Sequence, residues 1–359
     1  MYPLLTVATA KIADITRAIA EQLAANGTEL VGVTKAVDGE PAVAEVLLRA
    51  GCAGLADSRL PAIIRLAARN LGPITLIRSP QAEEIEPVAQ LVDRVVLSDP
   101  GAARALGAAV PGEPIRLLLD VDLGDRREGV LPEHALRVAE RLAGLPGTVL
   151  AGVAVNFACL SGLLPSVPLI RQAEDVLLSL GSLCDPNPVL SLGGTCCVPF
   201  AGRYRPRVRT EVRSGVGVLM GWDLCAGAPS PGITRAEPVL TAAVLESGPK
   251  PPPPPGPRGL DAFGHEPEVE LPQGEAIYTL IALGRRDAAP EALRPLDPGV
   301  RVAGMTSDVA VLITDRVYRP GDTVAFAVDY EGLVLAVTSP FVTKRYVRRT
   351  AAARGREGE

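Results

Sequence analysis

The sequence predicts an α/β protein in which a (β/α)8 barrel of the TIM type is followed by a smaller all-β domain. Two observations carry this prediction. Over about the first 220 of the 359 residues, short aliphatic or β-branched runs alternate with longer amphipathic stretches, which is typical of βα units around a parallel sheet. After Gly221 the sequence changes to strand-like runs separated by proline and glycine, which indicates a second, all-β domain.

Eight candidate strands can be counted in the first part of the chain, the number that closes a barrel of this type. They are expected at 29–34, 54–56, 74–77, 94–97, 115–121, 150–155, 189–192 and 212–220. Several of the helical patterns between them begin with proline, which is favoured at the first helical position; they lie at 10–25, 41–50, 61–70, 81–92, 132–143 and 169–180. Residues 1–228 are therefore assigned to the barrel, whose typical size is roughly 250 residues.

The rest of the chain is assigned to a β-domain, residues 229–347, and to a tail, residues 348–359, that we expect to be frayed. Within the β-domain, strands are expected at 237–246, 276–283, 300–314, 323–328 and 333–339. A proline-rich insertion at about 248–258 contains five consecutive prolines, Pro251–Pro255. We interpret it as an extended surface spacer, because such runs serve this role more often than they bind a partner module.

The composition excludes several classes of function. The formal net charge is -5 and charges of both signs are interspersed, which argues against a nucleic-acid surface. No apolar run is long enough to span a bilayer and the N-terminus lacks the features of a signal peptide, so a cytoplasmic protein with no membrane partner is expected. With only His134 and His265, catalytic triads and histidine zinc sites lack parts. The six cysteines lack CxxC spacing and are interpreted as reduced thiols.

Polar residues follow every predicted barrel strand. In barrels of this type the chemistry takes place at the carboxyl ends of the strands, so we expect these residues to surround the active site. In strand order they are Lys35; Asp57, Ser58 and Arg59; Arg78 and Ser79; Asp99; Asp122, Arg126 and Arg127; Asn156; the turn Gly193, Gly194 and Thr195; and Arg213 with Gly215.

Lys35 is the leading catalytic candidate. At the end of an apolar strand it should be partly desolvated, which favours the neutral amine that can form a Schiff base. The glycine turn ending at Thr195, together with Gly215, would offer backbone N–H groups to a phosphate where barrels commonly bind one. Each feature alone also has a structural explanation, as a lysine at the barrel rim or glycines that turn corners. A reactive lysine and a phosphate site together describe pyridoxal 5′-phosphate (PLP).

A set of motifs recurs in order along nearly the whole chain. They are VTKAV around Lys35, ADSR at 56–59, VDLGDRREG at 121–129, GVAVNFAC at 152–159, LGGT at 192–195, VRSGVGVLMG at 212–221, DAFG at 261–264, TSD at 306–308 and DYEGL at 329–333. With these motifs the chain resembles the alanine racemase family of PLP enzymes (fold type III), and it is most similar to the ornithine racemase branch. Single motifs are unspecific, whereas their order and spacing together are specific.

The resemblance implies a role for each matching residue. Lys35 would hold PLP covalently and move the α-proton of the substrate on one face of the cofactor. Arg127 would contact the side of the cofactor's 3-oxygen, Arg213 would face the pyridine nitrogen, and Asn156 would lie beneath the ring. Because a guanidinium keeps its proton, the pyridine nitrogen would stay largely unprotonated, which favours racemisation over transamination. For Arg127 and Arg213 the alternative is an Arg–carboxylate pair at the barrel rim.

The resemblance also implies a phosphate site and a dimer. The phosphate would be held by Gly194 and Thr195, the amides of Gly215 and Val216, and the Tyr330 hydroxyl from the β-domain. The protein would form a head-to-tail homodimer, in which each β-domain completes the site of the other subunit.

The chain departs from the family pattern in three places. Alanine racemases have a catalytic tyrosine after the glycine that corresponds to Gly284, and here Arg285 follows it. Cys159 and Asp308 are therefore the leading candidates for the second acid–base, with Asp287 and Tyr330 as alternatives. A tyrosine that binds the phosphate is also missing after VTKA, where Val37, Asp38 and Gly39 stand. Finally, Thr195, Cys196 and Cys197 occupy the place where ornithine-type relatives carry Asn and Ser.

These observations predict a PLP-dependent racemase that acts on a free amino acid, ornithine or a related one. Two alternatives remain open. One is a PLP lyase or aldolase of the same fold, such as the D-threonine aldolase type, which would normally require metal ligands as well. The other is a PLP-binding protein without turnover, which the missing tyrosine supports and the retained β-domain opposes.

Overall fold

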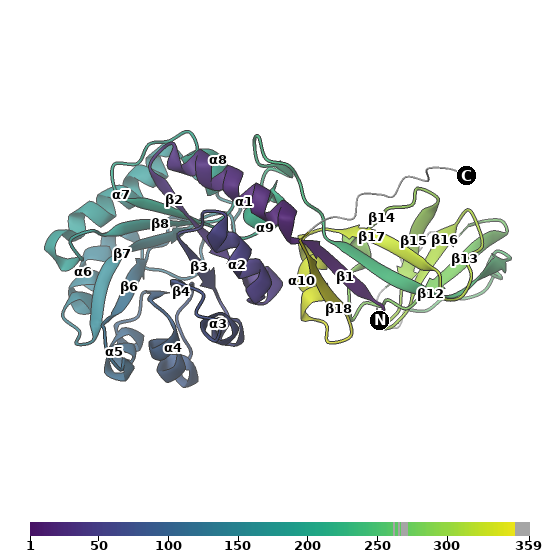
Figure 1. Cartoon of the computed structure of the whole chain (residues 1–359), viewed down its shortest axis with the longest axis horizontal. Coiled ribbons are helices and arrows are strands. Elements are labelled where there is room, and N and C mark those ends of the chain that lie inside the picture. Colours follow the sequence, from purple (N-terminus) through teal and green to yellow (C-terminus); the bar gives the residue numbers. More distant parts are fainter. Residues whose placement is uncertain (261–262, 265, 267–271, 349–359) are drawn as a thin grey trace. The chain divides into compact units, whose positions relative to one another are not determined.

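The computed structural model describes residues 1–260, 263–264, 266 and 272–348. Residues 349–359 of the expected tail, His265 and the first two residues of the DAFG motif lie outside the described residues. The chain divides into two compact units, one formed by Thr9–Ala236 and the other by Met1–Ala8 with the residues from Glu237 onward. Each unit is described below by itself (Figure 1).

The first unit is a closed barrel of eight parallel strands, as predicted. The last strand pairs with the first, with Thr28 opposite Thr210, and this pairing closes the ring. The strands are β2 (Thr28–Val33), β3 (Gly54–Asp57), β4 (Ile74–Leu76), β5 (Arg94–Leu97), β6 (Ile115–Asp120), β7 (Thr148–Asn156), β8 (Val189–Gly193) and β9 (Thr210–Ser214).

Amphipathic helices cover the barrel. In α6 (Pro132–Ala143) the buried residues Ala135, Val138, Ala139 and Leu142 recur at helical spacing on one face, and proline occupies the first position. The other helices are α1 (Thr9–Ala24), α2 (Pro41–Arg49), α3 (Leu60–Ala67), α4 (Ile85–Leu91), α5 (Pro100–Ala109), α7 (Val167–Leu180) and the short α8 (Cys197–Ala201) and α9 (Val216–Met220). No helix in the described part of the chain is long and apolar enough to cross a membrane.

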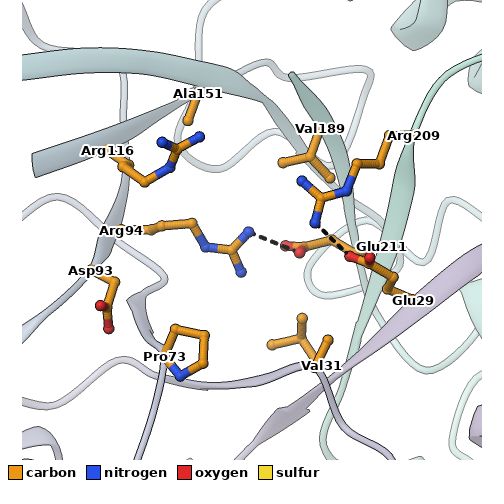
Figure 2. Close-up of a pocket in the computed structure, with 11 residues that line it drawn as sticks. Glu29, Val31, Pro73, Asp93, Arg94, Arg116, Ala151, Val189, Arg209 and Glu211 are labelled. Carbon is orange, nitrogen blue, oxygen red and sulfur yellow. Dashed lines mark hydrogen bonds and ion pairs between the residues drawn. The ribbon is translucent and has the colours of Figure 1, made fainter. Parts of the chain in front are cut away.

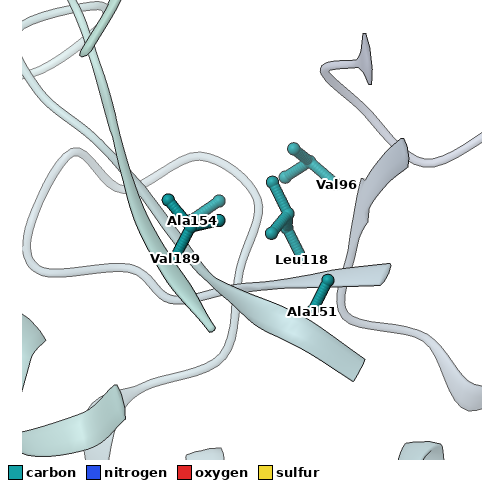
Figure 3. Packing of buried hydrophobic residues seen from close by; sticks show 5 residues of the cluster. All are labelled: Val96, Leu118, Ala151, Ala154 and Val189. Carbon is teal, nitrogen blue, oxygen red and sulfur yellow. The ribbon is translucent and has the colours of Figure 1, made fainter. Parts of the chain in front are cut away.

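The interior of the barrel differs along its axis. At the amino ends of the strands, a cavity of about 310 Å³ is lined by charged residues that include Arg94, Arg209 and Glu211 (Figure 2). Next to the cavity, residues from β5 to β8 pack into an apolar cluster (Figure 3); they are Val96, Leu118 and Ala154, with Ala151 and Val189, which also line the cavity. A second cluster joins Val31, Val33 and Ala56 of β2 and β3.

The second unit is built mainly on an antiparallel sheet, as predicted. Its strands follow the order β14-β17-β12-β13-β16-β15, and β1 pairs with β12 on one side and with β18 on the other. Their bounds are β1 (Leu4–Ala8), β12 (Val239–Lys250), β13 (Ala276–Ile281), β14 (Leu293–Pro295), β15 (Val300–Met305), β16 (Ala310–Thr314), β17 (Thr323–Val328) and β18 (Thr343–Val347). The run predicted as one strand at 300–314 is a hairpin, which turns where Thr306 N–H donates to Val309 O (2.8 Å).

Two predicted strands are partly or wholly helical. The strand expected at 212–220 ends at Ser214, and Val216–Met220 forms α9. The strand expected at 333–339 belongs instead to α10 (Tyr330–Thr338), whose N-cap Asp329 accepts a hydrogen bond from Gly332 N–H (2.9 Å). The parts of these runs that are helical are apolar, VGVLM at 216–220 and LVLAV at 333–337, and in such stretches periodicity does not distinguish a buried strand from a short buried helix. The second unit is therefore not all-β.

The domain bounds also differ from those expected. The first strand, β1, pairs in parallel with β18 and antiparallel with β12, so residues 1–8 belong to the second unit rather than to a barrel of residues 1–228. Its partners are more than 200 residues away in the sequence, and a local pattern cannot show which sheet a strand joins. β12 extends to Lys250, into the expected insertion at 248–258, and the Pro251–Pro255 run that follows is largely exposed.

Candidate active site

Lys35 lies directly after β2, where it begins a single turn of 3-10 helix, Lys35–Val37. The end of β2 is fixed by Thr34, whose Oγ1 donates a hydrogen bond to Asp57 Oδ2 (2.7 Å) at the end of the neighbouring β3. Lys35 itself is exposed. The partial burial expected at this position is therefore wrong, because the chain leaves the packed barrel interior as soon as the strand ends.

Some of the polar residues that follow the strands have structural roles instead. Asp99 caps α5 by accepting hydrogen bonds from two backbone N–H groups of its first turn. Arg78 forms an ion pair with Glu84 (2.7 Å), and Asp57 Oδ1 accepts from Ser58 N–H (2.7 Å) as well as from the next residue. A polar residue after a strand thus indicates a turn as often as a site.

Asp125 organises the loops after β6 and β7. Its Oδ2 accepts a hydrogen bond from Asn156 Nδ2 (2.9 Å), and its Oδ1 accepts from the backbone N–H groups of Cys159 (3.1 Å), Leu160 (3.0 Å) and Ser161 (3.2 Å). Burial alone would raise the pKa of Asp125, but these donors hold the pKa of this carboxyl below its usual range. The carboxylate therefore fixes Asn156 and the exposed Cys159 in one place.

Arg127 lies beside the same loop, and the rim ion pair considered as its alternative role is present. Its Nη2 donates to Glu128, and its Nη1 lies 3.9 Å from Asp125 Oδ2. Burial alone would lower the pKa of Arg127. The nearby Cys159, Glu128 and Asp125 together have the larger effect and raise the pKa above its usual value, so the guanidinium stays charged. Because 30% of its side chain remains exposed, Arg127 can still contact a ligand in the barrel mouth.

Arg213 is buried inside the barrel rather than paired at the rim. Its Nη1 donates to both the carbonyl oxygen (2.9 Å) and the hydroxyl (2.5 Å) of Ser191, and its Nη2 donates to Val155 O (3.2 Å). These bonds use three of the five N–H donors of a guanidinium. Gly193 lies beside it, and a Cβ added there would come within 2.5 Å of Arg213 Nη2 and 2.4 Å of Asn156 Oδ1. The two predicted cofactor contacts Arg213 and Asn156 are therefore brought together.

Asp120 ends β6 in the same region and is also buried. Burial raises its pKa to about 6, even though the positive charges of Arg213 and Arg127 oppose the rise. The interior thus holds a carboxyl group that changes its charge close to neutral pH.

The turn after β8 contacts the start of α9 through Thr195. Its Oγ1 accepts a hydrogen bond from Gly217 N–H (3.1 Å) and lies 3.2 Å from Ser214 Oγ. Gly215 is the N-cap residue of α9 and Val216 is its first residue, a position whose N–H has no acceptor within the helix. Hydroxyl and backbone donors of two segments therefore meet at one place, as a phosphate site requires.

The sequence neighbours of Thr195 lie beside this candidate phosphate site. Gly194 directly follows β8 and precedes Thr195, and Cys196 and Cys197 open α8. Both thiols are buried, and Cys197 Sγ lies 3.5 Å from Gly193 O. The cysteines at this departure from the family pattern are thus buried at the start of α8.

The remaining candidates, Asp308 and Tyr330, lie in the second unit. Asp308 is in the hairpin between β15 and β16, where its side chain is 69% exposed and its Oδ1 lies 3.6 Å from Arg286 Nη1. Tyr330 is the first residue of α10 and is half-buried. The predicted residues that the structure brings together are thus those of the barrel.

In the second unit, the segment that carries Arg285 packs directly on the segment that carries Asp308. Arg285 N–H donates to Thr306 O (2.9 Å), and a Cβ added at Gly284 would lie 2.0 Å from Ser307 O. Asp287, one of the alternatives for the second acid–base, is buried and accepts a hydrogen bond from Ser339 Oγ (2.7 Å). Its carboxylate thus has a structural role.

Sequence reasoning missed several residues of this site. Asp125 and Ser214 lie inside quoted motifs, but nothing in their type distinguished them from neighbouring turn residues. Glu211 did have a recognisable pattern, because it stands two positions before Arg213 in a buried strand and therefore points to the same face. Ser191 and Asp120 carried no such pattern, since their roles depend on which strands become neighbours.

The barrel mouth fits PLP on observations from this structure. In the described part of the chain, two N–H donors of the buried Arg213 have no acceptor, which suits an unprotonated pyridine nitrogen. Thr195, Ser214 and the start of α9 offer hydroxyl and N–H donors to a phosphate. Lys35 offers an exposed amine to the aldehyde.

Comparisons with known proteins agree with this geometry. The sequence profile described as "Alanine racemase, N-terminal domain" matches residues 7–221. The chain is 30% identical to a lysine racemase from Thermotoga maritima and 25% identical to an ornithine racemase from Acetoanaerobium sticklandii; each match covers 96% of this chain and 99% of the relative.

A solved alanine racemase from Bartonella henselae with covalently bound pyridoxal phosphate has the same fold, with a TM-score of 0.72 at 16% identity, over 96% of this chain and 99% of the other. Since the family profile matches more than half of the 359 residues and the lysine racemase aligns over nearly the whole chain, the protein belongs to the alanine racemase family.

Proposed function

We propose that the protein is a PLP-dependent racemase that interconverts the L and D forms of a free amino acid. The observation that carries the proposal is Arg213, a buried guanidinium that retains two N–H donors beside Asn156 in the mouth of a barrel whose first strand is followed by Lys35. The lysine and ornithine racemases to which the chain is similar support a basic amino acid as substrate.

Lys35 would hold the cofactor and would also exchange the proton at the substrate Cα. When bound, PLP supplies an acceptor for the electron pair left at that carbon. Arg213 donates hydrogen bonds toward the pyridine nitrogen and cannot protonate it, because a guanidinium keeps its own proton. Arg127 would provide a fixed positive charge next to the 3-oxygen of the cofactor and next to the substrate carboxylate. Asn156, held by Asp125, supports the ring from beneath.

The phosphate would be held by the donors around Thr195. Its hydroxyl, the Gly194 turn and the N–H groups of Gly215 and Val216 converge from β8 and α9. We assign the Tyr330 hydroxyl to the same phosphate across a head-to-tail homodimer, in which the second unit of one subunit completes the barrel mouth of the other. A cytoplasmic location is part of the same proposal.

The second proton is assigned to Cys159 or Asp308. Cys159 is exposed in the loop that Asp125 orders, close to Arg127. Asp308 would reach the opposite face only from a partner subunit. In deuterated water, loss of the second acid–base slows exchange of the α-proton of one enantiomer far more than that of the other. Of Cys159→Ala and Asp308→Ala, the variant that shows this asymmetry identifies the second acid–base.

The test of the proposed function compares Lys35→Ala with Lys11→Ala, since Lys11 is an exposed lysine of α1 outside the site. Wild type and Lys11→Ala are expected to show the absorbance of covalently bound PLP, and Lys35→Ala to lose it. Retention of that absorbance in Lys35→Ala, or its absence from the wild type, would overturn the assignment of Lys35.

The same proteins are then incubated with L- and D-lysine, ornithine and alanine in deuterated water. Exchange of the α-proton with inversion indicates a racemase. Carbon–carbon cleavage would replace the proposal with a lyase or aldolase, and PLP binding without exchange would replace it with a non-catalytic PLP-binding protein.

A further inference from the structure

Four polar side chains, three of them buried and one, Arg94, 13% exposed, form a continuous chain of hydrogen bonds through the barrel interior. Arg94 Nη1 of β5 donates to Glu211 Oε2 of β9 (2.8 Å), Ser191 Oγ of β8 donates to Glu211 Oε1 (2.5 Å), and Arg213 Nη1 donates to Ser191 Oγ (2.5 Å). Arg94 Nε is in turn bound to Thr75 Oγ1 of β4 (2.9 Å). We call Arg94, Glu211, Ser191 and Arg213 the interior relay.

The relay connects the two ends of the barrel. Arg94 and Glu211 line the cavity at the amino ends of the strands (Figure 2), whereas Arg213 lies beside Asn156 and Gly193 at the carboxyl ends. Glu211 and Ser191 are almost completely buried, with exposures of 1% and 0%. Charged groups are seldom placed so deep unless they are paired and hydrogen-bonded.

The bonds in the relay have a fixed direction. A serine hydroxyl has a single proton, and the Glu211 carboxylate can only accept, so the Ser191 proton points to Glu211. The lone pairs of Ser191 Oγ are then left for Arg213 Nη1, whose second hydrogen bond goes to the Ser191 carbonyl oxygen (2.9 Å). The orientation of the guanidinium therefore depends on the negative charge of Glu211 two bonds away, which Arg94 holds in place.

We propose that Ser191 and Glu211 are positioning residues that hold Arg213 so that its two remaining N–H groups face the pyridine nitrogen of PLP, with Arg94 anchoring Glu211. The inference rests on the proposed function, since it assumes a cofactor in the barrel mouth. Without the relay the guanidinium would turn, water or another donor could protonate the pyridine nitrogen, and the amino group of the substrate would be left on the cofactor more often.

The cavity offers a matched control. Glu29 stands directly opposite Glu211 in the pairing of β2 with β9, lines the same cavity, and forms an ion pair of the same length with Arg209 (2.8 Å; Figure 2). Its side chain is 41% exposed. Glu29→Gln therefore makes the same chemical change in the same strand layer without touching the relay.

The test compares holoenzymes carrying Glu211→Gln and Glu29→Gln. For Glu211→Gln we expect kcat to fall by about tenfold, the effect of one weakened charged hydrogen bond, with KM changed little. We also expect the pH dependence of the bound-PLP absorbance to shift, and the release of keto acid per racemisation event to rise. Glu29→Gln should match the wild type in all of these.

Ser191→Ala gives a second route in case Glu211→Gln does not fold, because it removes only a hydroxyl and keeps the carbonyl that binds Arg213. It should reproduce the spectral shift, and the double variant should add little to either single change. If the cofactor spectrum and keto acid release of Ser191→Ala match those of Glu29→Gln, the relay has no positioning role. That result would leave the proposed function intact, whereas failure of the wild type to bind PLP would overturn the proposed function itself.

Discussion

The two ends of the barrel carry similar residues but use them differently. At the amino ends of the strands, each arginine that lines the cavity is paired with a carboxylate: Arg94 with Glu211 (2.8 Å), Arg116 with Asp185 (2.7 Å) and Arg209 with Glu29 (2.8 Å). At the carboxyl ends, Lys35 is exposed, and Arg213 keeps donors without acceptors in the described structure.

The two ends therefore differ in which charged groups remain unpaired. Charges that line the cavity at the amino end neutralise one another, whereas the carboxyl end holds paired arginines, Arg78 and Arg127, together with the exposed Lys35 and the two remaining donors of Arg213. We propose that a ligand binds these last groups, as ligands do at this end of other barrels, and the relay joins an amino-end ion pair to one of them. Substitutions at the two ends should therefore separate stability from ligand binding.

The largest effect on stability is expected for Arg94→Met. It leaves the carboxylate of Glu211 buried without its ion-pair partner, which should lower the free energy of unfolding by about 3 to 4 kcal/mol. Urea denaturation measures the change, and Arg209→Met in the exposed pair, with an expected loss below about 1 kcal/mol, is the control. Equal losses in the two variants would contradict the distinction between these pairs.

The next effect concerns Asp120, whose pKa in the folded protein is raised by burial to about 6 from 3.8. Because the folded state binds this proton more tightly, the contribution of Asp120 to stability falls as the pH rises from about 4 to about 6 and is constant above that range. Asp120→Asn removes this loss, so at neutral pH the variant should be more stable by on the order of 2 kcal/mol. Thermal unfolding at several pH values tests this, and a gain that persists unchanged at pH 4 would point to another cause.

Thr195→Val should weaken PLP binding by about tenfold, the worth of one hydrogen bond to a charged group. The variant lacks the hydroxyl that would bind the phosphate and that accepts a hydrogen bond from Gly217 N–H. Equilibrium titration with PLP measures the affinity. Thr148→Val, at the amino end of β7, removes a hydroxyl that binds only Leu145 O and should leave the affinity unchanged.

The smallest effect is expected for Arg116→Met. Its partner Asp185 also accepts a hydrogen bond from Asn187 N–H, and the arginine side chain is 41% exposed. The free energy of unfolding should fall by less than about 1 kcal/mol, with PLP affinity and racemisation unchanged. A clear loss of PLP affinity in this variant would mean that the amino end contributes to ligand binding beyond the relay.

Much of the fold could be predicted from the sequence because the barrel repeats a local pattern. Each strand is a short apolar run followed by an amphipathic helix, and all eight strands were found within a few residues of their bounds, although the last one was extended over α9. The errors occurred where local pattern carries no information. α9 and the central part of α10 (333–337) are apolar runs without periodicity, and β1 pairs with strands at the other end of the sequence.

The candidate site was predictable to the extent that motifs mark it. Lys35, Asn156, Thr195 and Arg213 lie at or near strand ends, as expected. Their supporting residues could not be read in the same way. The role of Ser191 and Glu211 depends on their hydrogen bonds to each other and to Arg213, which form only when β8 and β9 lie side by side. The exposure of Lys35 depends on the residue at which β2 ends.

The close packing of Gly284 against Ser307 O has a consequence for redesign of the substrate range. Because no side chain fits between the two segments, we expect the segment that carries Arg285 and the hairpin that carries Asp308 to shift together. Any residue larger than glycine at position 284 would displace both at once, so the two segments should be exchanged between relatives together rather than one at a time.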